Sequence, residues 1–199
     1  MTNDGVNTTR RRFLTAATSV VGAGGVVGVA VPFVGSWFPS AKAKAAGAPV
    51  KFDISKLNPG EMKVVEWRGK PVYVVRRTAQ SLKALEGRDD QLKDPASASA
   101  DQPAYVGGNS RAINDEYLVL VGLCTHLGCA PKYRPEVGVF DDLGAEQWLG
   151  GFFCPCHGSK FDLSGRVYKG VPASANLVVP PYSFETDSVI VIGVDQEAA

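Results

Sequence analysis

Two short runs of residues, 124–129 and 154–159, constrain the fold and chemistry of this chain more than any other part of its sequence. They read C-T-H-L-G-C and C-P-C-H-G-S, and they contain all four cysteines and both histidines of the 199 residues. Each run holds one cysteine and one histidine at ligand spacing and adds one further cysteine. The pairs are Cys124 with His126 and Cys154 with His157, and the further cysteines are Cys129 and Cys156. Thiolates and imidazoles are ligands for zinc and iron, so the chemistry of this chain is expected at these two runs.

Three kinds of site can use these residues. Two cysteines and two histidines form the ligand set of a Rieske [2Fe–2S] centre, where two histidines replace two cysteines on one iron and raise the reduction potential. Structural zinc takes the same set, but zinc motifs usually place about 12–20 residues between ligand pairs, and residues 127–153 separate the pairs here. Two disulfides are the third alternative, which leaves unexplained why the only two histidines lie beside cysteines. We expect the iron–sulfur centre.

The complete pattern C-T-H-L-G-C … C-P-C-H-G-S resembles the Rieske subunit of the cytochrome bc1 complex, the quinol–cytochrome c oxidoreductase. Cluster domains of ring-hydroxylating oxygenases share the C-x-H … C-x-x-H ligands but lack the two further cysteines. The resemblance continues at residues 67–71, 77–78 and 93–95, and thus over nearly the whole chain. It implies one [2Fe–2S] cluster held by Cys124, His126, Cys154 and His157, with the thiolates on one iron and the histidines on the other. It also implies a disulfide between Cys129 and Cys156, which requires an oxidising compartment.

The same resemblance assigns roles to residues around the cluster. His126 and His157 are implied as the catalytic residues, because an iron-bound imidazole can take the proton of a quinol while the cluster takes the electron. Ser159 is implied to donate a hydrogen bond to a bridging sulfide, and Leu127 to shield the cluster at the quinol pocket. The plain alternatives are a serine in a turn and a leucine packed within its own loop. One departure is Phe161, because many family members have a tyrosine there that donates to a ligand thiolate.

The N-terminal segment indicates export and a membrane anchor. Residues 9–14, T-R-R-R-F-L, fit the twin-arginine export pattern, and no charged residue follows until Lys42. A helix over residues 13–38 would be about 39 Å long, enough for a hydrocarbon core of about 30 Å. Small-x-small sites over residues 41–45 allow the alternative of a cleaved signal. We favour the anchor, because the apolar run is longer than a signal's apolar region.

The remaining sequence predicts an all-β domain. Short alternating apolar runs with turns between them favour an antiparallel β-sandwich of Rieske type, with a small cluster-binding subdomain at about residues 124–174. The expected strands are residues 50–54, 63–67, 70–76, 117–123, 151–153, 167–168, 177–179, 184–186 and 189–194. A short helix is expected over 78–85 with Thr78 as its N-cap, and residues 86–111 are expected to form a loop.

These parts give a domain organisation for the whole chain. Residues 1–12 are expected to be a cytoplasmic twin-arginine segment, 13–38 a single transmembrane anchor, 39–49 a flexible hinge, and 50–199 a periplasmic Rieske domain. The protein would then belong to the inner membrane of a bacterium. A net charge of +1 and the absence of a basic stripe argue against nucleic acid as a partner.

The resemblance implies an enzyme subunit of quinol–cytochrome c reductase. It would accept one electron, with proton coupling, from quinol and pass it to a c-type cytochrome. The implied partners are cytochrome b and cytochrome c1, in a complex that is a dimer. Two rival functions are the small Rieske subunit of an arsenite-type oxidase and a zinc-stabilised periplasmic binding module.

Overall fold

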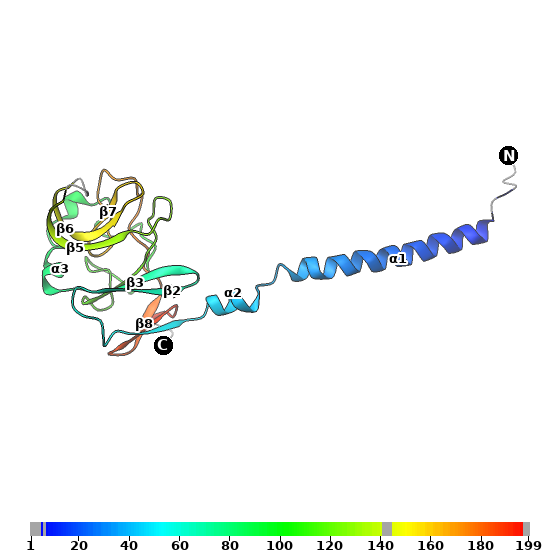
Figure 1. The fold of residues 1–199 in the computed structure, drawn as a ribbon, viewed down its shortest axis with the longest axis horizontal. Helices are drawn as coiled ribbons and strands as arrows, with labels where there is room; N and C mark the ends of the chain where they lie inside the picture. Colours follow the sequence, from blue (N-terminus) through cyan, green and yellow to red (C-terminus); the bar gives the residue numbers. More distant parts are fainter. Residues whose placement is uncertain (1–4, 6, 141–144, 197–199) are drawn as a thin grey trace. The chain divides into compact units, whose positions relative to one another are not determined.

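The computed structural model describes residues 5, 7–140 and 145–196 of the chain. These residues divide into two compact units, residues 1–45 and residues 46–199. The first unit carries the helix α1 (Thr8–Gly35) and most of α2 (Ala41–Ala46). The second carries β1 (Val50–Asp53), β2 (Met62–Trp67), β3 (Lys70–Arg76), α3 (Ala79–Lys83), η1 (Asp89–Gln91), β4 (Tyr117–Val121), β5 (Lys132–Phe140), β6 (Ala145–Cys154), β7 (Ser159–Phe161), β8 (Tyr182–Thr186) and β9 (Val189–Ile192) (Figure 1).

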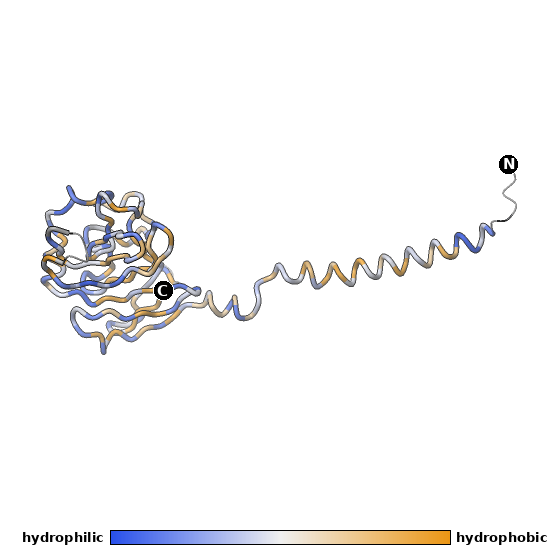
Figure 2. The backbone as a smooth tube through the Cα atoms, turned by 45° about the horizontal axis from the view of Figure 1, so that its top comes forward, coloured by the Kyte–Doolittle hydropathy of each residue, from blue (hydrophilic) through white to orange (hydrophobic). Residues whose placement is uncertain are grey.

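The helix α1 begins before the apolar segment and ends within it. Asn7 caps its N-terminus, where the side-chain oxygen accepts a hydrogen bond from the backbone N–H of Arg10 at 3.0 Å. Its 28 residues give a length of about 42 Å. Within the described residues it is the one helix long and apolar enough to cross a membrane. Hydrophilic residues gather at its N-terminal end and apolar ones along the rest (Figure 2). The twin-arginine run thus forms its first turns, and the expected anchor continues three residues beyond Gly35.

The β domain contains three antiparallel sheets of three strands each among its described residues. Two of these sheets have the strand orders β1-β9-β8 and β2-β3-β4. The central strand β3 has four consecutive buried residues, Val72 to Val75, which places apolar side chains on both of its faces. Pairing is antiparallel throughout the described ladders, so the expected all-β class is confirmed.

The third sheet, β5-β6-β7, carries the cluster-binding subdomain and was predicted only in part from the sequence. Residues 151–153 are the end of the long strand β6, whereas β5 and β7 were not expected. The expected strands at 167–168 and 177–179 were wrong as strands. Val167 and Tyr168 form only isolated bridges, to Phe161 and Leu92, and the carbonyl of Val178 accepts one hydrogen bond from the N–H of Val121.

The expected helix over 78–85 is confirmed in a shorter form as α3. The Thr78 hydroxyl accepts a hydrogen bond from the N–H of Ser81 at 3.1 Å, as an N-cap does. The segment 86–111 is irregular apart from η1, but Leu92 and Lys93 are tied to the turn after β7. This tie brings the segment against the subdomain that carries both cysteine runs.

A buried ionic network fixes the turn that follows β7. The Asp162 carboxylate accepts hydrogen bonds from Nε of Arg166 at 2.7 Å and from the N–H groups of Ser164 and Arg166. Arg77 and Arg111 donate to carbonyl oxygens of the same turn, at Leu163 and Ser164. Burial lowers the pKa of Arg77 and of Arg111 to about 10. These contacts hold the backbone of the turn, which is followed by residues 167–176.

Candidate metal centre

The two cysteine runs form two loops with the same backbone closure. The first follows β4 and the second connects β6 to β7. In each loop a glycine four residues after a cysteine donates its N–H to that cysteine's carbonyl oxygen at 2.9 Å, Gly128 to Cys124 and Gly158 to Cys154. Both glycines have positive φ, 80° and 73°, a conformation that costs little without a Cβ. The sequence C-x-x-x-G thus builds each loop locally.

The structure brings the four expected ligand side chains together as two pairs, the thiols of Cys124 and Cys154 and the rings of His126 and His157. Cys124 and Cys154 are free and buried, with 4% and 2% of their surface exposed. The rings of His126 and His157 lie edge to face, with centroids 4.8 Å apart. Nδ1 of His126 is buried and has no hydrogen-bond partner among the described residues. A buried ring nitrogen without a partner carries a desolvation cost that a bound metal would remove.

The protonation of the Cys154 thiol is also consistent with a site for a metal cation. Burial raises the pKa of the Cys154 thiol, and the adjacent Cys124 thiol raises it further. A bound metal reverses this effect, because it deprotonates a coordinating thiol. The donor set of two thiols and two imidazoles therefore fits a [2Fe–2S] cluster. The same donors would also satisfy zinc, so the geometry leaves both metals open.

The expected disulfide between Cys129 and Cys156 is present and joins the two loops. Its two sulfurs lie within 4.8 Å of Cys154 Sγ, so the bond sits directly beside the proposed ligands. Sulfurs committed to a disulfide cannot act as thiolate ligands. This leaves Cys124 and Cys154 as the available thiols.

A third segment, residues 171–175, closes the site through contacts with both cysteine loops. The N–H of Ala173 donates to Oγ of Ser159 at 3.0 Å, and the hydroxyl of Thr125 donates to the carbonyl of Ala175 at 2.6 Å. Ser159 is fully buried and keeps its own hydroxyl hydrogen available as a donor. Sequence reasoning missed Thr125, although its position between two ligands was a signal.

Two exposed side chains, the apolar Leu127 and the imidazole of His157, lie at the outer end of the site. Leu127 is 72% exposed, and His157 is also exposed. A leucine with this exposure makes little packing within its own loop, which removes the plain alternative for Leu127. The Leu127 side chain is therefore free to contact another molecule at this end of the site.

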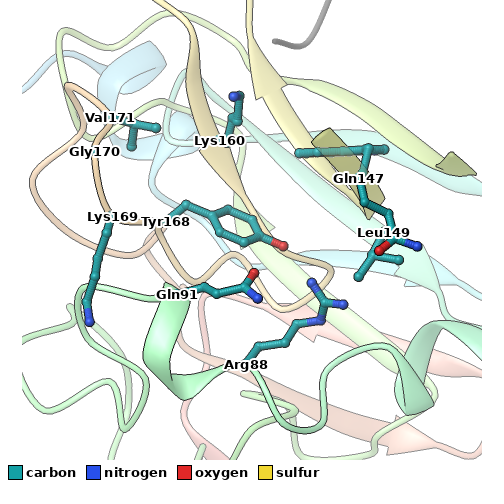
Figure 3. Close-up of a pocket in the computed structure, with 10 residues that line it drawn as sticks. Arg88, Gln91, Gln147, Leu149, Lys160, Tyr168, Lys169, Gly170 and Val171 are labelled. Carbon is teal, nitrogen blue, oxygen red and sulfur yellow. The ribbon is translucent and has the colours of Figure 1, made fainter. Parts of the chain in front are cut away.

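One cavity of the domain has none of the proposed ligands in its lining. It has a volume of about 480 Å³ and is lined in part by Arg88, Lys160 and Tyr168. Figure 3 shows the side chains of Lys160 and Lys169 extending in different directions from its wall. The cationic groups do not converge on one point, and we assign no ligand to it.

Comparisons with known proteins agree with the geometry. Residues 93–183 match the Rieske [2Fe-2S] domain, and residues 1–40 match the "Ubiquitinol-cytochrome C reductase Fe-S subunit TAT signal". The ubiquinol-cytochrome c reductase iron-sulfur subunit of Allochromatium vinosum is 56% identical over 199 residues, which cover 100% of this chain and 95% of that protein. The subunit of the same name from Blastochloris viridis is 44% identical and covers 96% of each chain.

Among solved structures, one titled "Hyperthermophilic respiratory Complex III" is 26% identical, with a TM-score of 0.48, and covers 88% of this chain and 98% of that one. The curated relatives decide between the open alternatives, because they favour iron–sulfur over zinc and the bc1 complex over an arsenite-type oxidase. The chain therefore belongs to the family of ubiquinol–cytochrome c reductase iron–sulfur subunits, the Rieske [2Fe–2S] electron-transfer subunits of the cytochrome bc1 complex.

Proposed function

We propose that Cys124 and Cys154 bind one iron of the cluster as thiolates and that His126 and His157 bind the other. The observations that carry this proposal are the pair of adjacent buried free thiols and the buried, unpartnered Nδ1 of His126. Nδ1 is then the nitrogen of His126 that faces the iron. A bound [2Fe–2S] cluster with two histidine ligands supplies a one-electron acceptor of raised potential.

The residues at the exposed end of the site take part in quinol oxidation. When Nδ1 of His126 faces the iron, Nε2 is the nitrogen left to meet substrate. The same division applies to His157, whose ring is more exposed. A ring nitrogen there accepts the proton of a quinol hydroxyl, and Leu127 contacts the apolar ring of the quinol and excludes water. Ser159 holds its hydroxyl hydrogen toward the buried interior of the site.

The electron then passes to a c-type cytochrome, and the partners in the complex are cytochrome b and cytochrome c1. We infer a single-pass arrangement, with residues 1–12 in the cytoplasm, 13–38 as the anchor, 39–49 as the hinge and 50–199 in the periplasm. The helix α1 and the disulfide support it, because a disulfide persists in an oxidising compartment. The assembled complex is a dimer.

The ligand assignment is tested by electron paramagnetic resonance of the reduced protein in native membranes. Replacing Cys124, His126, Cys154 or His157 is expected to remove the Rieske signal. Leu127→Ala is the matched control, because Leu127 is in the same loop but offers no ligand atom. It should keep the signal and lower quinol oxidation. A His157→Gln variant with an unchanged signal would refute the assignment.

The topology is tested separately on the full chain. Intact-mass analysis of the purified subunit distinguishes a retained anchor from a cleaved signal, and a mass that lacks residues 1–40 would contradict the anchor. Protease added to spheroplasts should digest the β domain and leave the segment before α1 protected.

A further inference from the structure

Lys93 makes an unusual contact with the segment that closes the metal site. Its Nζ donates to the carbonyl oxygens of Val171 at 2.7 Å and of Ala173 at 2.6 Å. Lys93 is 80 residues away from Ala173 in the sequence, so this is a tertiary contact. The ammonium group has three donors and uses two of them on one short stretch of backbone.

The backbone of Lys93 is itself fixed beside this segment. Its N–H donates to the carbonyl of Val167 at 3.0 Å, and the preceding residue, Leu92, is fully buried and bridges to Tyr168. Lys93 therefore extends from a rigid point. Ordering a long lysine side chain costs conformational entropy, which only a favourable contact repays.

Lys93 holds one end of a segment, residues 171–175, that connects to both cysteine loops. The N–H of Ala173 donates to Ser159 Oγ, and the carbonyl of Ala175 accepts from Thr125. The Ala173 peptide fixes the serine oxygen on one side, so the hydroxyl hydrogen must point elsewhere. A displacement of residues 171–173 would release the serine rotamer.

We propose that Lys93 is a positioning residue for the iron–sulfur site, which holds residues 171–173 against Ser159 and thereby raises the cluster's reduction potential. The inference rests on the proposed function. Its physical basis is that a hydrogen bond to a cluster sulfur raises the potential, and that an oriented hydroxyl makes this bond more often than a free rotor. The positive charge of Lys93 acts in the same direction.

Lys169 provides a matched control for the charge. It lies at the start of the same segment, and its Nζ donates to the carbonyl of Asp90 at 2.7 Å, outside residues 171–173. Figure 3 shows the Lys169 side chain extending away from Gly170 and Val171. Removing its charge therefore changes the local electrostatics without releasing the contact to Ser159.

The experiment compares Lys93→Met, Lys93→Gln, Lys93→Arg and Lys169→Met in the purified full complex. The midpoint potential of the cluster is measured by redox titration followed by electron paramagnetic resonance. Lys93→Met should lower the equilibrium constant for reduction about fivefold, ~40 mV for a one-electron couple. Lys93→Arg should stay within about twofold of the wild type, because arginine keeps the charge and the donors. Hydrogen exchange at the Ala173 amide should be faster in Lys93→Met.

Several results would overturn the proposal. A wild-type potential in Lys93→Met would do so, even if less cluster is retained, because a merely structural role changes occupancy and not potential. An equal shift in Lys169→Met would show an effect of charge alone. Loss of the cluster from both neutral variants would assign Lys93 to assembly of the site instead. Absence of a Rieske signal from the wild type would instead refute the proposed function.

Discussion

The Phe161→Tyr substitution tests how this subunit sets its reduction potential. Phe161 is fully buried in β7, two residues after Ser159. Side chains two apart in a strand share a face, so the Phe161 ring lies on the same side of β7 as the Ser159 hydroxyl. The ring belongs to the same buried cluster as Cys124 and Cys154. A tyrosine would add one hydroxyl at the end of this ring.

The size of the effect follows from where the new hydroxyl points. If it donates to a cysteine ligand, one hydrogen bond of about 1 kcal/mol favours the more negative, reduced state and raises the potential by about 40 mV. If it finds no partner, a buried hydroxyl costs about 1–3 kcal/mol of stability and leaves the potential unchanged. The first outcome therefore changes the reduction potential, and the second changes the free energy of unfolding.

Protein-film voltammetry gives the potential of both forms, and thermal unfolding gives the stability. We expect a rise of tens of millivolts with little loss of stability. Phe161→Leu serves as the control, because it changes packing without adding a donor. A downward shift, or no shift with a lower midpoint of unfolding, would mean that position 161 has no role in setting the potential.

Three further predictions concern the domain that carries the site. Replacing Cys129 and Cys156 with serine should keep some cluster and lower the free energy of unfolding by ~3.5 kcal/mol, the closure value for a separation of 27 residues, as measured by urea unfolding. Asp162→Asn removes the buried carboxylate partner of Arg166, leaves only the exposed Asp89 at 3.6 Å, and should cost about 3–5 kcal/mol in the same assay, with Asp187→Asn, in an exposed turn, as an inert control. Burial raises the pKa of Tyr133 to about 12, so its native form keeps a proton that the unfolded chain releases above about pH 10. Stability should therefore fall from pH 10 to 12, less steeply in Tyr133→Phe, and an equal slope in both forms would contradict this.

The strands that could be predicted from the sequence are those whose pattern is uninterrupted. The strand β3 was predicted at its observed bounds because three valines and one tyrosine follow one another between turn residues, and β-branched and aromatic side chains favour a strand. The strand β5 was missed because Pro135 and Gly138 interrupt its alternation, and its ladder has register shifts at these places. The strand β7 has three residues, too few to show a period.

The side chains of the site were predictable, but the backbone contacts that brace it were not. Thiolates and imidazoles are common metal ligands, so the four proposed ligands could be selected from their residue type and their spacing in the sequence. The contact of Lys93 with Val171 and Ala173 uses carbonyl oxygens, which every residue has. Such a contact has no signature in the sequence, and only the fold brings its two ends together.

The backbone closure of the two loops supports the proposed choice of cysteine ligands independently of resemblance. Cys124 and Cys154 are the two residues whose carbonyl oxygens accept the glycine N–H. They therefore occupy equivalent positions in the two loops, and each is buried. The other two cysteines do not correspond, because Cys129 follows its glycine whereas Cys156 precedes Gly158. This inequivalent pair crosses between the loops as the disulfide. The two cysteines at equivalent positions stay free thiols, as the proposed ligand assignment requires.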